Sequence, residues 1–187
     1  VRTAGMPVFI GFYQAVACRL ARLTDDSEGA LQAARESEAA FLSMGGDNWT
    51  IAGLGIGATG ALISGDIAGA GERLARIWSP SRTPSLPLQG YRWALPAFGE
   101  HALRTRSTAA ALSFLDWYVD VRERHGGHRE AAEGRYWRGR VRAVESDDTG
   151  AKDDFTQARA TFARLGGHAH LWRIDAALSM LARRTRA

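Results

Sequence analysis

The sequence repeats itself with a period of about 40 residues, and this repeat constrains the fold more than any other feature. The most regular position is an alanine that recurs at spacings of 40, 41 and 40 residues. The four alanines are Ala30, Ala70, Ala111 and Ala151. Self-similarity at a fixed period of roughly 20–50 residues is typical of chains built from stacked supersecondary units.

Each of these alanines lies in a predicted helix with a start signal and an apolar stripe. Four positions earlier stands a good N-cap residue, whose side-chain oxygen can accept from the free amides of the first helical turn. These residues are Asp26, Asp66, Ser107 and Asp147. Large or apolar residues follow at the fourth position after each alanine, namely Ala34, Leu74, Leu115 and Phe155. Such spacing predicts a helix with one buried face.

A second predicted helix precedes the capped one in each unit. Twelve positions before the alanines, small residues allow another helix to approach closely: Cys18, Ala58, Gly99 and Gly139. Fifteen positions after the alanines, three units carry a pair of glycines and the other carries Ser85; the pairs begin at Gly45, Gly126 and Gly166. Glycine tolerates the left-handed backbone that ends a helix. We call the upstream helix of each unit the first helix and the capped helix the second.

The pattern predicts an all-α fold, an α-solenoid of about four helix–turn–helix units followed by a C-terminal capping helix. The expected units are 6–44, 47–84, 88–125 and 128–165, and the expected last helix is 169–184, all within a single repeat domain covering 1–187. Units of this kind bury their apolar faces by stacking on their neighbours. The stretch SPSRTPSLPLQG, residues 79–90, is expected to be a longer loop or a small hinge.

One glycine-rich stretch matches a different pattern. Gly55-x-Gly57-x-x-Gly60 fits the dinucleotide-binding fingerprint, which needs a preceding strand and an acidic residue about 20 positions further on. No carboxylate stands there, and the repeat places these glycines inside a first helix. Glycine costs a helix roughly 1 kcal/mol against alanine. We expect the compensation to be a close approach of neighbouring helices, or room for a ligand in a groove.

The spacing small–x11–Ala–x3–large–x2–small resembles the tetratricopeptide repeat (TPR), and Gly139, Ala151, Phe155 and Ala158 match it best. The segment ARATFARLGGHAHLWRIDAALSMLA resembles the closing repeats of large bacterial regulators of the LuxR and MalT type. This resemblance implies a non-enzymatic module that binds a partner protein, or other domains of the same chain, within a signalling ATPase or transcriptional regulator. The alternative is a sensor domain that holds a small-molecule effector in the concave groove.

In such arrays the first helices line the concave face, which gives a set of candidate groove residues. Aromatic side chains and arginines dominate interface energies, and an arginine fork can hold a carboxylate through two hydrogen bonds. The candidates are Phe12, Arg19, Thr59, Trp93, Glu100, Tyr136, Arg140 and Arg173.

Other chemistry finds little support in the sequence. The repeat places His128 and His168 at equivalent positions of successive units, too far apart for one metal ion, and no catalytic or cofactor motif is present, so we expect no cofactor and no enzyme. The net charge of +4 is mild, and we expect neither direct nucleic-acid binding nor membrane binding. The single cysteine, Cys18, is expected in the core, and a reducing cytoplasm is the expected location. The start at Val1 suggests a fragment of a longer protein.

Overall fold

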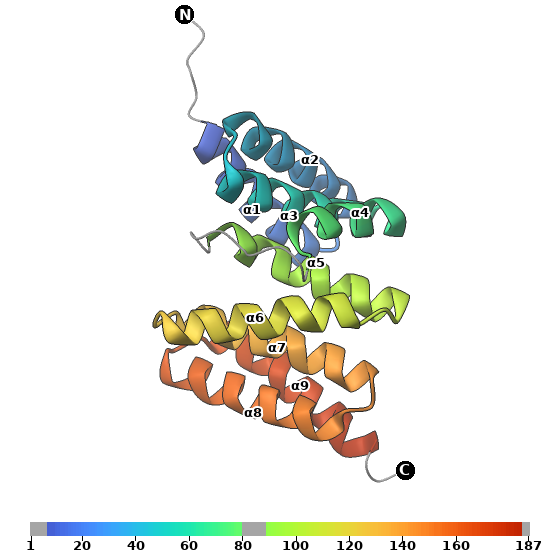
Figure 1. Ribbon diagram of the computed structural model, residues 1–187, viewed down its shortest axis with the longest axis vertical. Coiled ribbons are helices and arrows are strands. Elements are labelled where there is room, and N and C mark those ends of the chain that lie inside the picture. Colours follow the sequence, from blue (N-terminus) through green and yellow to red (C-terminus); the bar gives the residue numbers. More distant parts are fainter. Residues whose placement is uncertain (1–6, 80–88, 185–187) are drawn as a thin grey trace, which may run out of the picture. The chain divides into compact units, whose positions relative to one another are not determined.

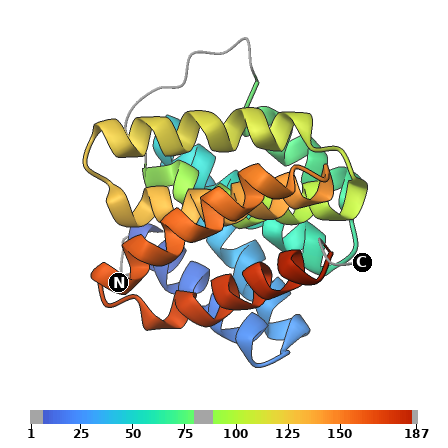
Figure 2. The same cartoon turned by 90° about the horizontal axis from the view of Figure 1, so that it is seen from below.

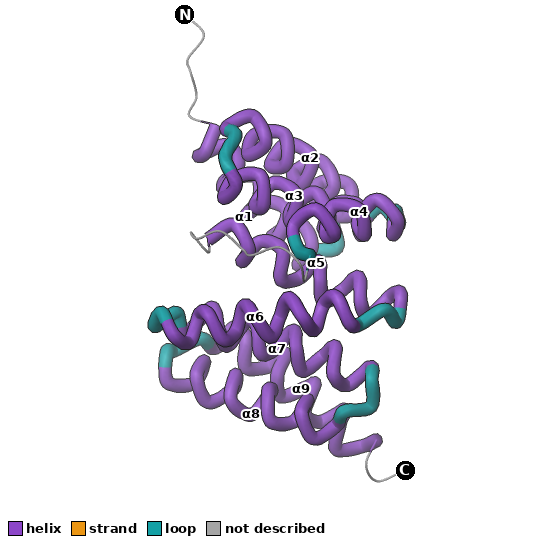
Figure 3. Tube along the Cα trace, viewed as in Figure 1, coloured by secondary structure: helices purple, strands orange, loops and turns teal. Residues whose placement is uncertain are grey.

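The computed structural model describes residues 7–79 and 89–184. Within these ranges every regular element is an α-helix and no strand is present, so the prediction of an all-α chain is confirmed (Figures 1 and 3). In the same ranges, none of the helices has the combination of length and apolar character that crossing a membrane requires.

The helices fall into two compact units, residues 1–101 and 102–187. Unit 1 contains α1 (Pro7–Leu23), α2 (Ser27–Met44), α3 (Asp47–Ile63), α4 (Ile67–Ile77) and most of α5 (Gln89–Thr105). Unit 2 contains α6 (Ala109–Arg124), α7 (His128–Val144), α8 (Asp148–Arg164) and α9 (His168–Arg184). Whether 1–187 is one repeat domain stays a prediction.

Within each unit, helices that follow one another in the chain pack together. In unit 1, α2 contacts both α1 and α3, and α3 contacts α4. In unit 2, α7 contacts both α6 and α8, and α8 contacts α9, which is the red helix of Figure 2. The first helices are therefore α1, α3, α5, α7 and α9, and the second helices are α2, α4, α6 and α8.

Three second helices begin with the same capping arrangement. Asp26, Asp66 and Asp147 accept from the backbone amide three residues later, at 2.8, 2.8 and 2.9 Å. That third residue is always a glycine, and a Cβ atom there would lie only 2.1–2.3 Å from the cap carboxylate. The repeat therefore includes a motif Asp-x-x-Gly-Ala, in which glycine makes room for the cap.

The predicted cap of α6 is wrong. Thr108, not Ser107, is the residue before this helix, and its side chain makes no capping hydrogen bond. The hydroxyl of Thr108 instead donates to the carboxylate of Glu145. Position 110 corresponds to the glycine of the Asp-x-x-Gly-Ala motif in the other three repeats, and here it is an alanine.

The turns between the first and second helices keep the same register in all four sequence repeats. The residue before each aspartate cap, or before Ser107, has a positive φ, whether or not it is glycine: Asp25, Gly65, Arg106 and Ser146. Positive φ also occurs at Gly45, Gly126 and Gly166, which confirms the predicted glycine ends of three second helices. Ser85 lies outside the described residues, as does most of the expected loop over 79–90.

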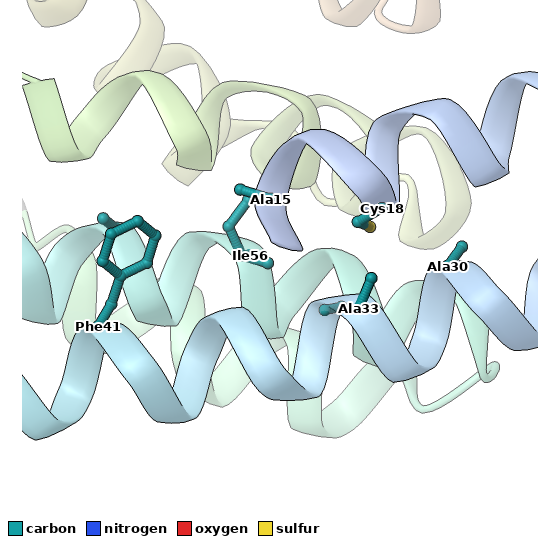
Figure 4. Close-up of a cluster of buried hydrophobic side chains, with 8 residues drawn as sticks. Ala15, Cys18, Ala30, Ala33, Phe41 and Ile56 are labelled. Atoms are coloured by element: carbon teal, nitrogen blue, oxygen red, sulfur yellow. The ribbon is translucent and has the colours of Figure 1, made fainter. Parts of the chain in front are cut away.

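The core of unit 1 is made largely of small residues, as the predicted close packing requires. Ala15 and Cys18 of α1 meet Ala30, Ala33 and Phe41 of α2, and Ile56 of α3 completes the cluster (Figure 4). Cys18 is fully buried, so its predicted place in the core is confirmed.

Helix α3 contains all the glycines of the dinucleotide-like fingerprint, as the repeat predicted. A Cβ at Gly55 would lie 2.8 Å from the backbone nitrogen of Ala94 in α5, and a Cβ at Gly60 would lie 2.9 Å from the Cβ of Ala34 in α2. A Cβ at Gly57 would overlap the carboxylate of Glu38, which is 2.2 Å away. These glycines serve close packing, and the space beside each is already filled.

Candidate functional site

Three of the candidate groove residues come together in unit 1. The ring centroids of Phe12 and Trp93 are 6.0 Å apart, and the guanidinium carbon of Arg19 lies 4.9 Å from the centroid of Trp93. Phe12 also packs edge-on against Phe41 at 5.3 Å and Trp49 at 5.8 Å. All three candidates are half-buried, so their exposed edges form a mixed aromatic and cationic surface.

The other two candidates of unit 1 are engaged within the unit. Thr59 is only 6% exposed, and its hydroxyl donates to the carbonyl of Gly55 at 3.1 Å. Glu100 accepts from the guanidinium of Arg22 in an ion pair between α5 and α1. Thr59 thus offers almost no surface to a ligand, and a ligand of Glu100 would compete with Arg22.

Unit 2 has a second arginine–aromatic group on α7. The guanidinium carbon of Arg140 lies 5.9 Å from the ring centroid of Tyr136 and 5.1 Å from that of Trp137. Tyr136 also packs against Phe155 of α8 at 6.1 Å. Tyr136 and Arg140 are half-buried and Trp137 is buried, so the ring of Trp137 forms the base of this group.

The last candidate lies on α9. The guanidinium carbon of Arg173 is 5.2 Å from the ring centroid of Trp172. Trp172 is 63% exposed. Arg173 and Trp172 therefore form a pair on the surface of α9 that resembles the Arg140 group in chemistry.

Sequence reasoning missed a buried ion network in unit 2. Asp154 of α8 is 1% exposed and accepts two hydrogen bonds from Arg138 of α7, at 2.8 and 2.6 Å. Arg142 lies 3.2 Å and Arg135 3.6 Å from the same carboxylate. Arg138 also donates to Asp116 of α6 at 2.9 Å. Arg138 thus joins the carboxylates of α6 and α8 through α7.

The sequence carried a signal for this network. Arg135, Arg138 and Arg142 are three and four residues apart, which places them on one face of a helix. Burial alone would lower the pKa of Arg138, but the hydrogen bonds and charges of Asp154 and Asp116 raise that pKa above its ordinary value.

Unit 1 contains a smaller ion pair. Arg73 of α4 donates to Glu38 of α2 at 2.8 and 3.4 Å. The hydrogen bond with Glu38 raises the pKa of Arg73. The carboxylate of Glu38 also fills the space beside Gly57 of α3. This side chain of α2 therefore contacts both α3 and α4. This pair has a structural role.

Two titratable groups of unit 1 are shifted towards their neutral forms. Burial raises the pKa of the Cys18 thiol, against the opposing charges of Arg22 and Arg19. Burial lowers the pKa of His101, against a backbone hydrogen bond at Ile67. The raised pKa favours the neutral thiol of Cys18 over the thiolate. Because the thiolate is the reactive form of cysteine, Cys18 is a poor candidate for a nucleophile.

The described residues hold no group of three or more His, Cys, Asp or Glu side chains that could bind a metal ion. His128 begins α7 and His168 begins α9, so the two residues lie on different first helices. His170 stacks on Phe162 with ring centroids 4.2 Å apart.

Comparison with protein-family models, with curated proteins and with solved structures found no match for this chain.

Proposed function

We propose that this chain is a TPR-like α-solenoid of four helix pairs and a closing helix, acting as a non-enzymatic protein-interaction module of a bacterial signalling or transcriptional regulator of the LuxR and MalT type. Its partner is another protein or another domain of its own chain. The partner offers carboxylates to arginines that stack on aromatic rings. This activity needs no cofactor.

The regular placement of caps and turns supports the repeat architecture. Three aspartate caps have the same geometry, and positive φ recurs one residue before each predicted cap. Four independent turns that agree in register favour repeated units over an irregular helical bundle. The resemblance to the regulator family rests on the sequence pattern alone.

The group around Arg140 is the observation that carries the proposed binding activity. The guanidinium of Arg140 lies over the rings of Tyr136 and Trp137, and this stacking restricts the rotamers of the arginine. The N–H groups of a guanidinium lie in its own plane, so they point away from the direction of stacking. Less rotamer entropy is then lost when a carboxylate binds. Arginine and aromatic side chains are the types that most often dominate binding energy at protein interfaces.

The alternative function is a small-molecule sensor that holds an effector in the concave groove. The glycines of α3 add no support to it, because the space beside them is occupied by α2, α5 and the side chain of Glu38. Thr59, the candidate residue on the same helix, is buried.

The test uses the purified chain as bait, followed by direct titration of each captured protein by calorimetry. We expect the double variant Tyr136→Ala, Arg140→Ala to weaken binding of the true partner by at least about tenfold, the factor that corresponds to roughly 1.4 kcal/mol. The matched control is Arg129→Ala, which removes an exposed arginine near the start of the same helix. This control should bind like the unaltered chain.

Two outcomes would contradict the proposal. One is a partner whose affinity is unchanged in the Tyr136 and Arg140 variant while circular dichroism shows an intact fold. The other is a metabolite that raises the melting temperature in a concentration-dependent way, which would favour the sensor instead.

A further inference from the structure

Helix α9 has a side on which cationic and apolar residues alternate. Four of its residues follow the spacing three, four, three, which places them on one side of the helix: Arg173, Ala176, Met180 and Arg183. We call these four residues the α9 face. The opposite side of α9, with Ile174 and Leu181, is buried in the core of unit 2.

The repeat places the α9 face beside the proposed binding site on α7. An offset of 40 residues relates these two first helices, so Ala176 corresponds to Tyr136 and Met180 corresponds to Arg140. Helices α7 and α9 also contact each other directly within unit 2. A ligand that binds Arg140 therefore has the equivalent side of the next first helix beside it.

The accessible charge on these two sides is positive. Arg173 is half-buried and Arg183 is exposed. Asp175 is the one acidic residue in the sequence of α9, and its carboxylate accepts from Arg159 of α8 at 2.6 Å. On α7 the residue equivalent to Arg173 is Glu133, which is only 8% exposed. An occupant therefore meets guanidinium groups and very little carboxylate, which favours an anionic partner.

Apolar side chains lie among these arginines. Met180 is 67% exposed, and Trp172, whose ring lies close to the guanidinium of Arg173, is exposed as well. Covering such apolar area removes it from water and stabilises a complex. Charge and apolar area together favour a partner that carries carboxylates with apolar side chains between them.

Two other anionic partners fit this surface less well. Arg140 is half-buried on α7, whereas its equivalent Met180 is well exposed on α9, so the surface has a step that a flat bilayer does not follow. Single-stranded nucleic acid binds largely by stacking its bases on open aromatic rings. Tyr136 already has Arg140 and Phe155 against it, so a base would have to displace one of them.

We infer that the α9 face is the second half of the binding site, and that the partner is an acidic protein segment that spans α7 and α9. Its carboxylates bind Arg140, Arg173 and Arg183. Its apolar side chains cover Met180 and Trp172. This inference rests on the proposed function, because it extends the site around Arg140, and it adds the second helix and the apolar part of the partner.

The test is binding of a fluorescently labelled glutamate–tyrosine copolymer to the full chain, measured by anisotropy at several salt concentrations. We expect this copolymer to bind more tightly than poly-glutamate of the same length, because only the copolymer can cover the apolar residues. Added salt should weaken binding of both polymers, since it screens the charges. The variant Arg173→Ala, Arg183→Ala should weaken binding of the copolymer by at least about tenfold, because two charge-assisted contacts are lost.

The matched control is Lys152→Ala, Arg164→Ala, which removes the same charge from exposed positions of α8. This control should weaken binding by less than about threefold, because exposed charges away from the site are screened. Circular dichroism of each variant checks that the fold is intact.

Equal weakening in the α9 variant and in the α8 control would overturn the inference, because net charge alone would then explain binding. Tighter binding of single-stranded RNA or of phosphatidylserine vesicles than of the copolymer would overturn it too, as would the absence of copolymer binding at low salt. The variant Tyr136→Ala, Arg140→Ala tests the proposed function separately. If it weakens binding and the α9 variant does not, the inference fails and the proposed function stands. The reverse result contradicts the proposed role of Arg140 and keeps α9 as a binding helix.

Discussion

Helix α3 of unit 1 and helix α7 of unit 2 occupy equivalent places in the repeat, yet they pack by opposite means. Leu54, Gly57 and Ala61 of α3 correspond to Arg135, Arg138 and Arg142 of α7. In unit 1 these positions are buried by close helix approach, whereas in unit 2 they form ion pairs around Asp154. The same backbone arrangement can thus be held by close apolar packing or by a satisfied polar network.

The two solutions differ in what a mutation can break. At a glycine contact, an added side chain destabilises the fold because the facing backbone atoms cannot move away. In an ion network, a mutation destabilises the fold when it leaves a buried charge without its partner. Unit 2 should therefore be more sensitive to the loss of one carboxylate than unit 1 is to any added methyl group.

The largest effect is expected for Asp154→Ala. It leaves the buried guanidinium of Arg138 without its main partner, and we expect the free energy of unfolding to fall by about 3 kcal/mol. Urea unfolding followed by circular dichroism measures this change. Asp153→Ala, next to it and exposed, should change stability by less than about 0.5 kcal/mol. Equal effects of the two variants would show that the network contributes little.

In unit 1, Gly55→Ala should destabilise by about 2 kcal/mol, because the new Cβ meets the backbone of α5. Gly57→Ala should cost less, about 1 kcal/mol, since the obstructing group is the movable carboxylate of Glu38. The same unfolding assay compares them. If Gly55→Ala stabilises the chain, as helix propensity alone predicts, then α3 and α5 pack less closely than described.

The caps offer a finer comparison across the repeat. Removing the capping carboxylate with Asp147→Ala should cost about 1 kcal/mol, because the amide of Gly150 loses its partner. Ser107→Ala, at the position that does not cap α6, should change stability by less than about 0.5 kcal/mol. A large loss in Ser107→Ala would show that this serine caps α6 in solution.

The smallest expected effect concerns pH. Burial lowers the pKa of His101 in the folded chain, so the unfolded chain binds the proton more readily. The free energy of unfolding should therefore decrease as the pH falls through the ordinary histidine range near about 6.5, and should level off below the folded pKa. The variant His101→Val, which carries the residue found at the equivalent Val141, should lose this part of the decrease. An identical pH profile in both chains would mean that His101 is solvated when folded.

Much of the secondary structure could be predicted from the sequence because its signals are local. A capping aspartate acts within one helical turn, and a glycine with positive φ acts within its own turn, so Asp26, Asp66 and Gly126 could be interpreted without tertiary information. The cap at Ser107 was wrong for a non-local reason: Thr108 forms its hydrogen bond with Glu145, a residue far away in the chain.

The candidate site was predicted less well. The repeat gave the register of the first helices, and it brought Phe12 and Trp93, or Tyr136 and Arg140, into the same groups. It could not show that Thr59 is buried or that Glu100 is paired with Arg22, since both depend on which helix lies across from them.

The sequence by itself determined the helical class of the described residues, the places where three second helices start, and the absence of a strand-to-helix turn at Gly55, because caps, periodicity and glycine turns act over a few residues. Tertiary structure alone decided what the small and charged positions do. Gly57 makes room for Glu38, and Arg138 binds Asp154 and Asp116. These outcomes depend on atoms that come together only when α2, α3 and α4, or α6, α7 and α8, are packed.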